Sequence, residues 1–235
     1  MSTTIQQAIE DVNDRIKNAC ERVGRNPKEV TLIAVSKTMP VDAIREAMDC
    51  GMIEFGENRP QELRDKQAVI TEPLHWHMIG ALQTNKLKYV VGKTVMIHSV
   101  DTLHLAEAIE EASLKNDVIS DVLLEINIAG EATKHGIAPE HLEELVKQIS
   151  SFSHIKIRGL MTVAPYTDNP EENRVYFKKM KQLMVDINSK NIDNVYMDIL
   201  SMGMTGDYEI AIEEGATHVR VGTGIFGHRV YTLKE

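Results

Sequence analysis

The chain has 235 residues, of which 43% are hydrophobic and 26% charged, and its net charge at pH 7 is −9. Such a composition is typical of a soluble globular protein, and the negative charge argues against nucleic acid as a main partner, because phosphate backbones bind basic surfaces. Cys20 and Cys50 have neither pairing nor metal-ligand spacing, which fits a reducing, cytoplasmic location. The polar N-terminus is unlike a signal peptide, and no apolar run approaches the roughly 18 residues of a membrane span. We therefore expect no membrane partner.

Apolar residues with helical spacing predict a first helix at residues 3–23. After it, short β-branched runs alternate with amphipathic stretches. The runs predict eight strands, at residues 30–36, 53–55, 75–79, 95–100, 122–126, 157–161, 195–200 and 218–221. The stretches predict seven helices, at residues 41–50, 60–70, 83–91, 102–115, 139–150, 170–189 and 207–214. No linker or change of composition divides the chain, so we expect a single domain over residues 1–235.

Several helix ends carry recognisable signals. Helix starts are indicated at Pro40, at Pro139 and at Asp168 with Pro170, and left-handed ends at Gly51 and Gly215. These signals support the alternation of strand and helix.

Alternating strands and helices fit either a closed (β/α)₈ barrel or an open doubly wound sheet. An open sheet that binds a dinucleotide carries a glycine-rich turn after its first strand, whereas here that turn is 36-SKTMP-40. Glycine clusters instead follow the seventh and eighth strands, where barrels frequently bind phosphate. The sequence therefore favours an α/β fold with a TIM-type barrel and an extra N-terminal helix.

Polar residues that are able to bind a ligand follow several predicted strands. In a barrel these ends meet at one rim, which carries the active site. The residues are Lys37 after the first strand, Asn58 after the second, Ser201 to Gly206 after the seventh, and Arg220 with Gly222, Thr223 and Gly224 at the eighth. The two loops offer hydroxyls and backbone N–H groups for a phosphate.

Lys37 ends the run 32-LIAVSK-37 at the mouth of the first strand. A lysine in this position is often simply solvated. A desolvated lysine has a lowered pKa and forms an imine with an aldehyde. The pattern alone leaves both readings open.

Arg220 alternates with Val219 and Val221, so it lies on the opposite face of its strand. A buried arginine needs a partner, and one reading is a structural ion pair with Asp198 or Glu57. The other is a cation that faces a ring nitrogen of a ligand and keeps it unprotonated, because arginine does not give up its proton.

The histidines give weaker signals. His75 and His77 are spaced by two on a strand with no third metal ligand nearby, which argues against a metal site. His98 and His104 are interpreted as surface or capping residues.

Six motifs resemble, in order, those of the pyridoxal phosphate homeostasis family (YggS/PROSC-like proteins). They are 34-AVSKT-38, 56-GENRPQE-62, 76-WHMIGALQTNK-86, 158-RGLMT-162, 200-LSMGMTGD-207 and 220-RVGTGIFG-227. The resemblance spans residues 5–229. It departs from the family at Thr205, where serine is frequent, although a hydroxyl is kept.

This resemblance implies a barrel like the N-terminal domain of alanine racemase, with pyridoxal 5′-phosphate held as a Schiff base. The family's residue roles fall on this chain as follows: the lysine that bonds the cofactor on Lys37, the asparagine near its hydroxyl on Asn58, the serine at its phosphate on Ser201, the glycine of the same loop on Gly203, the arginine at its ring nitrogen on Arg220, and the last phosphate loop on Gly222 and Thr223.

The resemblance also implies a protein that buffers and delivers the cofactor in vitamin B6 homeostasis, with apo-enzymes as recipients and no robust catalysis. Because Glu235 follows the last phosphate loop so closely, we expect no second domain of the kind that supplies a racemase with its opposing base. The alternatives are a small racemase-like enzyme, in which His77, Tyr166 or Tyr208 reaches the cofactor, and a barrel that binds an unrelated sugar phosphate. We expect a monomer, because no long unpaired apolar stripe remains.

Overall fold

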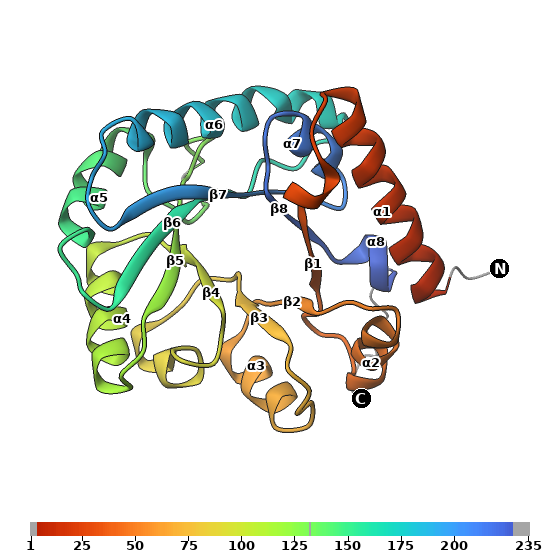
Figure 1. The fold of residues 1–235 in the computed structure, drawn as a ribbon, viewed down its shortest axis with the longest axis horizontal. Helices are drawn as coiled ribbons and strands as arrows, with labels where there is room; N and C mark the ends of the chain where they lie inside the picture. Colours follow the sequence, from red (N-terminus) through yellow and green to blue (C-terminus); the bar gives the residue numbers. More distant parts are fainter. Residues whose placement is uncertain (1–3, 132, 228–235) are drawn as a thin grey trace.

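The computed structural model describes residues 4–131 and 133–227. They form a closed barrel of eight parallel strands in chain order, and β1 pairs with β8 to complete the ring (Figure 1). The strands are β1 (Thr31–Val35), β2 (Glu54–Glu57), β3 (His75–Met78), β4 (Met96–Val100), β5 (Ser120–Glu125), β6 (Ile155–Met161), β7 (Val195–Met204) and β8 (His218–Val221). The predicted barrel is confirmed, and every predicted strand overlaps an observed one.

Helices surround the strands on the outside of the ring (Figure 1). The α-helices are α1 (Ile5–Arg22), α2 (Val41–Asp49), α3 (Pro60–Gln67), α4 (Leu103–Lys115), α5 (Leu142–Ile149), α6 (Arg174–Asn188), α7 (Tyr208–Glu213) and α8 (Thr223–Phe226). Short 3₁₀ helices are η1 (Pro27–Glu29), η2 (Thr84–Tyr89), η3 (Pro139–His141) and η4 (Pro170–Asn173).

The extra N-terminal helix α1 packs across α7 and α8 (Figure 1). It begins with a capping box, in which the Thr4 hydroxyl accepts from the backbone of Gln7 and the Gln7 side chain accepts from the backbone of Thr4. Its buried face carries Ile9, Val12 and Ile16. This face covers the seam where the last strand returns to the first, beside the loops that form the cavity.

Three predicted helices differ in detail from the structure. The predicted helix at 83–91 is the 3₁₀ helix η2, and the helices predicted at 139–150 and 170–189 each begin with a 3₁₀ turn at a proline. Asn169, and not Asp168, caps the last of these, because its side chain accepts from the backbone N–H of Glu171 at 3.3 Å. The four-residue helix α8 after β8 was not predicted, because it is too short to show a period.

Gly51 and Gly215 follow their helices with φ of +87° and +100°, which confirms the predicted left-handed ends. Gly203 in β7 has φ of +90°, and a Cβ there would lie 2.6 Å from Cβ of Ala211. Gly203 therefore allows α7 to pack closely on β7.

Two apolar regions form the core. The larger lies between the strands and the outer helices and contains most buried hydrophobic residues. The smaller lies inside the barrel and consists of Met96, Leu123, Met161 and Ile199. Within residues 4–131 and 133–227, no helix has the length and apolarity needed to cross a bilayer.

Candidate functional site

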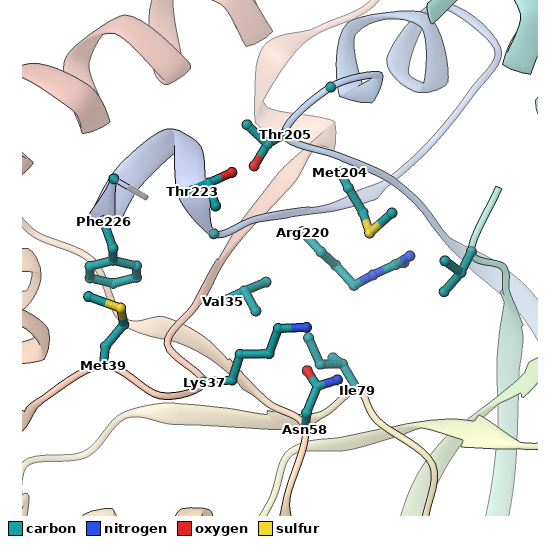
Figure 2. Close-up of a pocket in the computed structure, with 14 residues that line it drawn as sticks. Val35, Lys37, Met39, Asn58, Ile79, Met204, Thr205, Arg220, Thr223 and Phe226 are labelled. Atoms are coloured by element: carbon teal, nitrogen blue, oxygen red, sulfur yellow. The ribbon is translucent and has the colours of Figure 1, made fainter. Parts of the chain in front are cut away.

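A cavity of about 410 Å³ opens at the carboxyl ends of the strands (Figure 2). Its size is in the usual range for a small-molecule site. Its lining comes mainly from β1, β2, β7, β8 and the loops that follow them: Val35, Lys37, Met39, Asn58, Ile79, Val163, Met204, Thr205, Gly206, Arg220, Gly222, Thr223, Phe226 and Gly227. Five of the seven predicted site residues, all except Ser201 and Gly203, belong to this set.

Lys37 lies two residues beyond the end of β1, and its side chain extends along the cavity with its amine toward Arg220 and Asn58 (Figure 2). Thr38, the next residue, adopts φ of +64°, a conformation that costs a residue with a Cβ on the order of 1 kcal/mol. A backbone held in such a conformation needs strong contacts on both sides.

These contacts come from α3 and β2. The Lys66 ammonium donates to the Ser36 carbonyl at 2.7 Å, on one side of Lys37. The Glu62 carboxylate accepts from the backbone N–H of Thr38, on the other side. Lys66 and Glu62 are themselves paired at 2.7 Å. We call these two residues the Lys66–Glu62 clamp, because together they hold both peptide groups that flank Lys37.

Glu57 completes this buried arrangement. Its Oε1 accepts from the Lys66 ammonium and from the Ser36 hydroxyl, each at 2.6 Å. Burial raises the pKa of the Glu57 carboxyl, and the nearby Lys66 charge opposes this shift. The clamp was not predicted, because the positions of Glu62 and Lys66 on one helix do not show which loop their side chains contact.

Arg220 forms the floor of the cavity and is 4% exposed. Its guanidinium donates to the Ser201 hydroxyl at 2.7 Å and to the Thr162 carbonyl at 2.8 Å. A guanidinium has five N–H donors, so donors remain for a ligand. Burial lowers the pKa of Arg220 to about 10, and the group therefore stays charged at neutral pH.

The alternative reading of Arg220 as part of a structural ion pair is wrong. Asp198 instead pairs with Arg158 at 2.6 Å. Glu57 pairs with Lys66 at 2.6 Å. Carboxylates of Asp207 and Glu125 favour the charged form of Arg220 only through longer-range attraction.

Asn58 follows β2 and lines the cavity beside Lys37 (Figure 2). Its Oδ1 is buried and has no hydrogen-bond partner among the residues that the structure describes. A buried polar atom without a partner is costly. An oxygen acceptor at this position fits a ligand that carries a hydroxyl group.

The loops after β7 and β8 bring Thr205, Gly206, Gly222 and Thr223 to the other end of the cavity (Figure 2). The Thr205 hydroxyl accepts from the backbone N–H of Gly224 at 3.3 Å, which ties the two loops together. Two hydroxyls and several peptide groups thus face one space, an arrangement that suits a phosphate.

Ser201 does not line the cavity, which corrects the position expected for a phosphate ligand. It is fully buried below the floor, inside the barrel, where its hydroxyl contacts Arg220 at 2.7 Å and His98 at 3.0 Å. Gly203 also lies outside the lining and serves the packing of α7. The strand continues to Met204, and the hydroxyl that reaches the cavity is that of Thr205.

The structure corrects two further predictions. His98 is fully buried inside the barrel and is not a surface residue. His77, Tyr166 and Tyr208, the candidates for a group facing the cofactor, do not line the cavity. Tyr166 is 90% exposed and Tyr208 is 1% exposed. Among the described residues, no cluster of histidine, cysteine or carboxylate side chains fits a metal ion.

A barrel whose open end joins an amine, a buried cation and two hydroxyl-bearing loops defines a class of protein that holds a phosphorylated small molecule. The alanine racemase N-terminal domain family matches residues 10–230. A relative from Aquifex aeolicus, named pyridoxal phosphate homeostasis protein, is 46% identical over 226 residues, covering 96% of this chain and 98% of its own. The relative with the same name from Escherichia coli K12 is 38% identical, covering 98% of this chain and 99% of its own.

Solved structures agree with these relatives. PipY of Synechococcus elongatus, determined with pyridoxal phosphate bound, superposes with a TM-score of 0.81 at 35% identity, covering 91% of this chain and all of its own. Alanine racemase from Corynebacterium glutamicum shares the fold, with a TM-score of 0.68 at 14% identity, and this chain covers 64% of its length. The chain therefore belongs to the pyridoxal phosphate homeostasis family, within the barrels that resemble the N-terminal domain of alanine racemase.

Proposed function

We propose that this protein binds pyridoxal 5′-phosphate as a Schiff base on Lys37 and holds it for delivery to apo-enzymes, without robust catalysis of its own. The observation that carries the proposal is the cavity, in which the Lys37 amine lies between Arg220, Asn58 and the hydroxyl-bearing loops. The naming of the relatives after pyridoxal phosphate homeostasis and the pyridoxal phosphate in PipY support it. We further propose that the chain works as a single cofactor-binding domain.

The lining fits the cofactor group by group. Arg220 has N–H donors left for a ring nitrogen, and Asn58 Oδ1 needs a donor such as the ring hydroxyl. Val35 and Ile79 offer apolar contact to the ring. We assign the phosphate to the loops after β7 and β8, where Thr205 supplies the hydroxyl ligand in place of Ser201.

When bound, pyridoxal phosphate supplies an aldehyde that condenses with an amine and a ring that withdraws electrons from the substrate carbon. Lys37 would supply the amine for this condensation, which would release the aldehyde oxygen as water without any change in oxidation state. The Lys66–Glu62 clamp holds the Lys37 backbone in place for this step.

The same lining argues against turnover. A ring nitrogen withdraws electrons strongly only when it is protonated. Arg220 does not give up its proton, so a ring nitrogen that faces it stays unprotonated. Lys37 and Arg220 are the two titratable side chains among the described lining residues, so no second acid or base stands opposite the lysine. Positioned acid–base groups typically contribute about 10²–10⁴-fold to a rate.

Reduction with borohydride tests the covalent part. The purified protein mixed with pyridoxal phosphate is expected to gain a visible absorbance band that borohydride bleaches irreversibly. Peptide mapping is then expected to place the stable adduct on Lys37. An adduct on another lysine, or none, contradicts the proposal and favours the barrel that binds an unrelated sugar phosphate.

Delivery and the absence of catalysis need separate measurements. We expect the loaded protein to activate a pyridoxal phosphate-dependent apo-enzyme at a rate equal to or higher than the rate at which it releases pyridoxal phosphate into solution. Incubation with L-alanine in deuterated water is expected to give no more deuterium at Cα than free cofactor gives. Rapid deuteration with formation of the D-isomer would establish the racemase alternative.

A further inference from the structure

A continuous chain of hydrogen bonds runs through the barrel interior below the cavity. Arg220 contacts Ser201 at 2.7 Å, and the Ser201 hydroxyl contacts His98 Nδ1 at 3.0 Å. His98 Nε2 contacts His77 Nδ1 at 3.0 Å, and His77 Nε2 contacts the Glu54 carboxylate at 2.8 Å. These five residues, here called the interior relay, come from β8, β7, β4, β3 and β2.

The relay joins two different environments. Ser201, His98, His77 and Arg220 are buried, with exposed fractions of 0–4%. Glu54 is the first residue of β2, at the opposite mouth of the barrel, and its side chain is 22% exposed. The relay therefore connects the floor of the cavity to solvent at the amino-terminal mouth.

The positions of the protons determine in which direction the hydrogen bonds of the relay donate. Burial, with the nearby charges of His77, His218 and Arg220, lowers the pKa of His98 well below its ordinary value, so His98 is neutral and carries one N–H. If that proton is on Nε2, His98 donates a hydrogen bond to His77 Nδ1, and the Ser201 hydroxyl donates to His98 Nδ1. His77 is then neutral, and its Nε2–H meets the Glu54 carboxylate, whose pKa is lowered by hydrogen bonds from His77 and His75 against the effect of burial. Every donor then has an acceptor.

The reverse direction requires an added proton. If His98 carries its proton on Nδ1, His77 must donate through Nδ1 to His98 and also through Nε2 to Glu54, and it is then a cation. The Ser201 hydroxyl loses His98 as its acceptor. An O–H that donates makes its oxygen a better acceptor, so the neutral relay holds the Arg220 guanidinium more firmly than the protonated relay.

We propose that Ser201, His98 and His77 are positioning residues for Arg220, which fix its guanidinium beneath the cofactor ring through hydrogen bonds that end at the Glu54 carboxylate. The inference rests on the proposed function, because it assigns the relay to the cofactor site. Arg220 donates to the ring nitrogen most firmly when the relay is neutral.

Other charged groups surround the relay. They are His75, which contacts the second oxygen of Glu54 at 2.7 Å, His218, which packs against the rings of His77 and His98, Asp198 near His218, and Asp207 and Glu125 near Arg220. Burial lowers the pKa of His218 to about 4, so it remains neutral and adds no competing charge.

The first test needs no cofactor. The ¹⁵N resonances of the imidazoles distinguish the two neutral tautomers, and at about pH 8 we expect both His98 and His77 as the Nε2–H form. An Nδ1–H tautomer at either residue at this pH overturns the relay.

The second test reads the cofactor ring, with pyridoxal phosphate labelled with ¹⁵N in the ring. In the wild-type protein the resonance is expected to be that of an unprotonated, hydrogen-bonded nitrogen. Ser201→Ala separates Arg220 from His98, so the Lys37 adduct should still form, the resonance should shift toward that of a more weakly hydrogen-bonded nitrogen, and affinity should fall about 2- to 10-fold.

Glu54→Gln and His75→Gln form a matched pair at the partly exposed end, where folding is least at risk. Glu54→Gln weakens the acceptor of the His77 Nε2–H at the end of the relay, so the ring resonance should shift in the same direction as in Ser201→Ala, but by less. His75→Gln removes a partner of the same carboxylate outside the relay and should leave the ring resonance at its wild-type position.

The outcomes separate the two proposals. Failure of the wild-type protein to form an adduct on Lys37 contradicts the proposed function, whereas the imidazole tautomers still test the relay. With the adduct present, a wild-type ring resonance in Ser201→Ala, or equal ring resonances in Glu54→Gln and His75→Gln, overturns the relay.

Discussion

The two sides of the barrel rim differ in charge. After β1, β2, β7 and β8, the described residues that line the cavity include Lys37 and Arg220 and no carboxylate. After β4 and β5, the rim carries the carboxylates of Asp101 and Glu125. Because the chain has a net charge of −9, an anionic ligand depends on this local separation: one side attracts a phosphate and the other repels it.

The carboxylate side shows how burial changes the pKa of a carboxyl group when no cation pairs with it directly. Glu125 is 8% exposed, and burial, together with the nearby charge of Asp101, raises its pKa to about 7. On the cavity side, the buried carboxylate of Glu57 is paired with Lys66 at 2.6 Å. Four predictions test this contrast.

The largest effect is expected for Lys37→Ala, which removes the amine from the cavity side. The visible band and the adduct that survives borohydride should both be lost completely, while weaker binding through the phosphate loops persists. Lys179→Ala, an exposed lysine on α6, is the matched control and should leave both signals unchanged. A remaining adduct in Lys37→Ala would show that another lysine bonds the cofactor.

Thr205→Val removes a hydroxyl from the phosphate end while keeping the shape of the side chain. Affinity for pyridoxal phosphate should fall by about 1–3 kcal/mol, the scale of a hydrogen bond to a charged group. Affinity for pyridoxal, which lacks the phosphate, should change much less. Titration calorimetry with both compounds measures the difference, and Thr71→Val, on the exposed surface, is the control. Equal losses for both compounds would place the phosphate elsewhere.

Glu125→Gln tests the carboxylate side through stability. The folded protein holds the Glu125 proton up to about pH 7, whereas the unfolded chain releases it near the ordinary pKa of 4.5. Stability therefore falls as the pH rises through this window, and the full penalty applies above about pH 7. We expect the variant to raise the free energy of unfolding at about pH 8 by about 1–3 kcal/mol.

Urea unfolding at several pH values measures this effect. The gain should vanish below about pH 4.5, where Glu125 is protonated in both states. Glu140→Gln, at an exposed carboxylate, should show no such dependence. If the gain in the free energy of unfolding is the same at every pH, the ionised form of Glu125 does not destabilise the folded protein.

The smallest effect is expected for Glu62→Gln, which weakens the Lys66–Glu62 clamp. The ratio of affinities for pyridoxal phosphate and pyridoxine phosphate should fall about 2- to 10-fold, because the second compound has an alcohol in place of the aldehyde and cannot bond to Lys37. Glu72→Gln, which removes an exposed partner of Arg45, is the control. An unchanged ratio would mean that the clamp does not position Lys37.

The barrel followed from local patterns. Runs of β-branched residues marked the strands, prolines and glycines marked helix ends, and the glycine clusters after β7 and β8 indicated the phosphate loops. Once the strands were placed, Lys37 and Arg220 had to meet at one rim, because all carboxyl ends of a parallel barrel lie on the same side. The strand ends also indicated Asn58 and Thr223, the resemblance to the family implied their roles at the cofactor, and the cavity contains both.

Local patterns in the sequence did not predict the contacts inside the barrel. Alternation along a strand tells which residues face inward, but barrel closure and the offset between strands decide which of them share a layer. Ser201 and His98 were therefore misplaced, one expected at the phosphate and the other at the surface, although they are hydrogen-bonded to each other at 3.0 Å.

The sequence by itself determined the order of the elements, the open end of the barrel and the lysine that stands there, because each of these depends on neighbours along the chain. Only the tertiary structure decided the partners: Lys66 and Glu62 around Lys37, and the relay from Glu54 to Arg220. Hydrogen bonds of buried side chains require contact within about 3 Å, and that distance is set by how distant strands and helices pack.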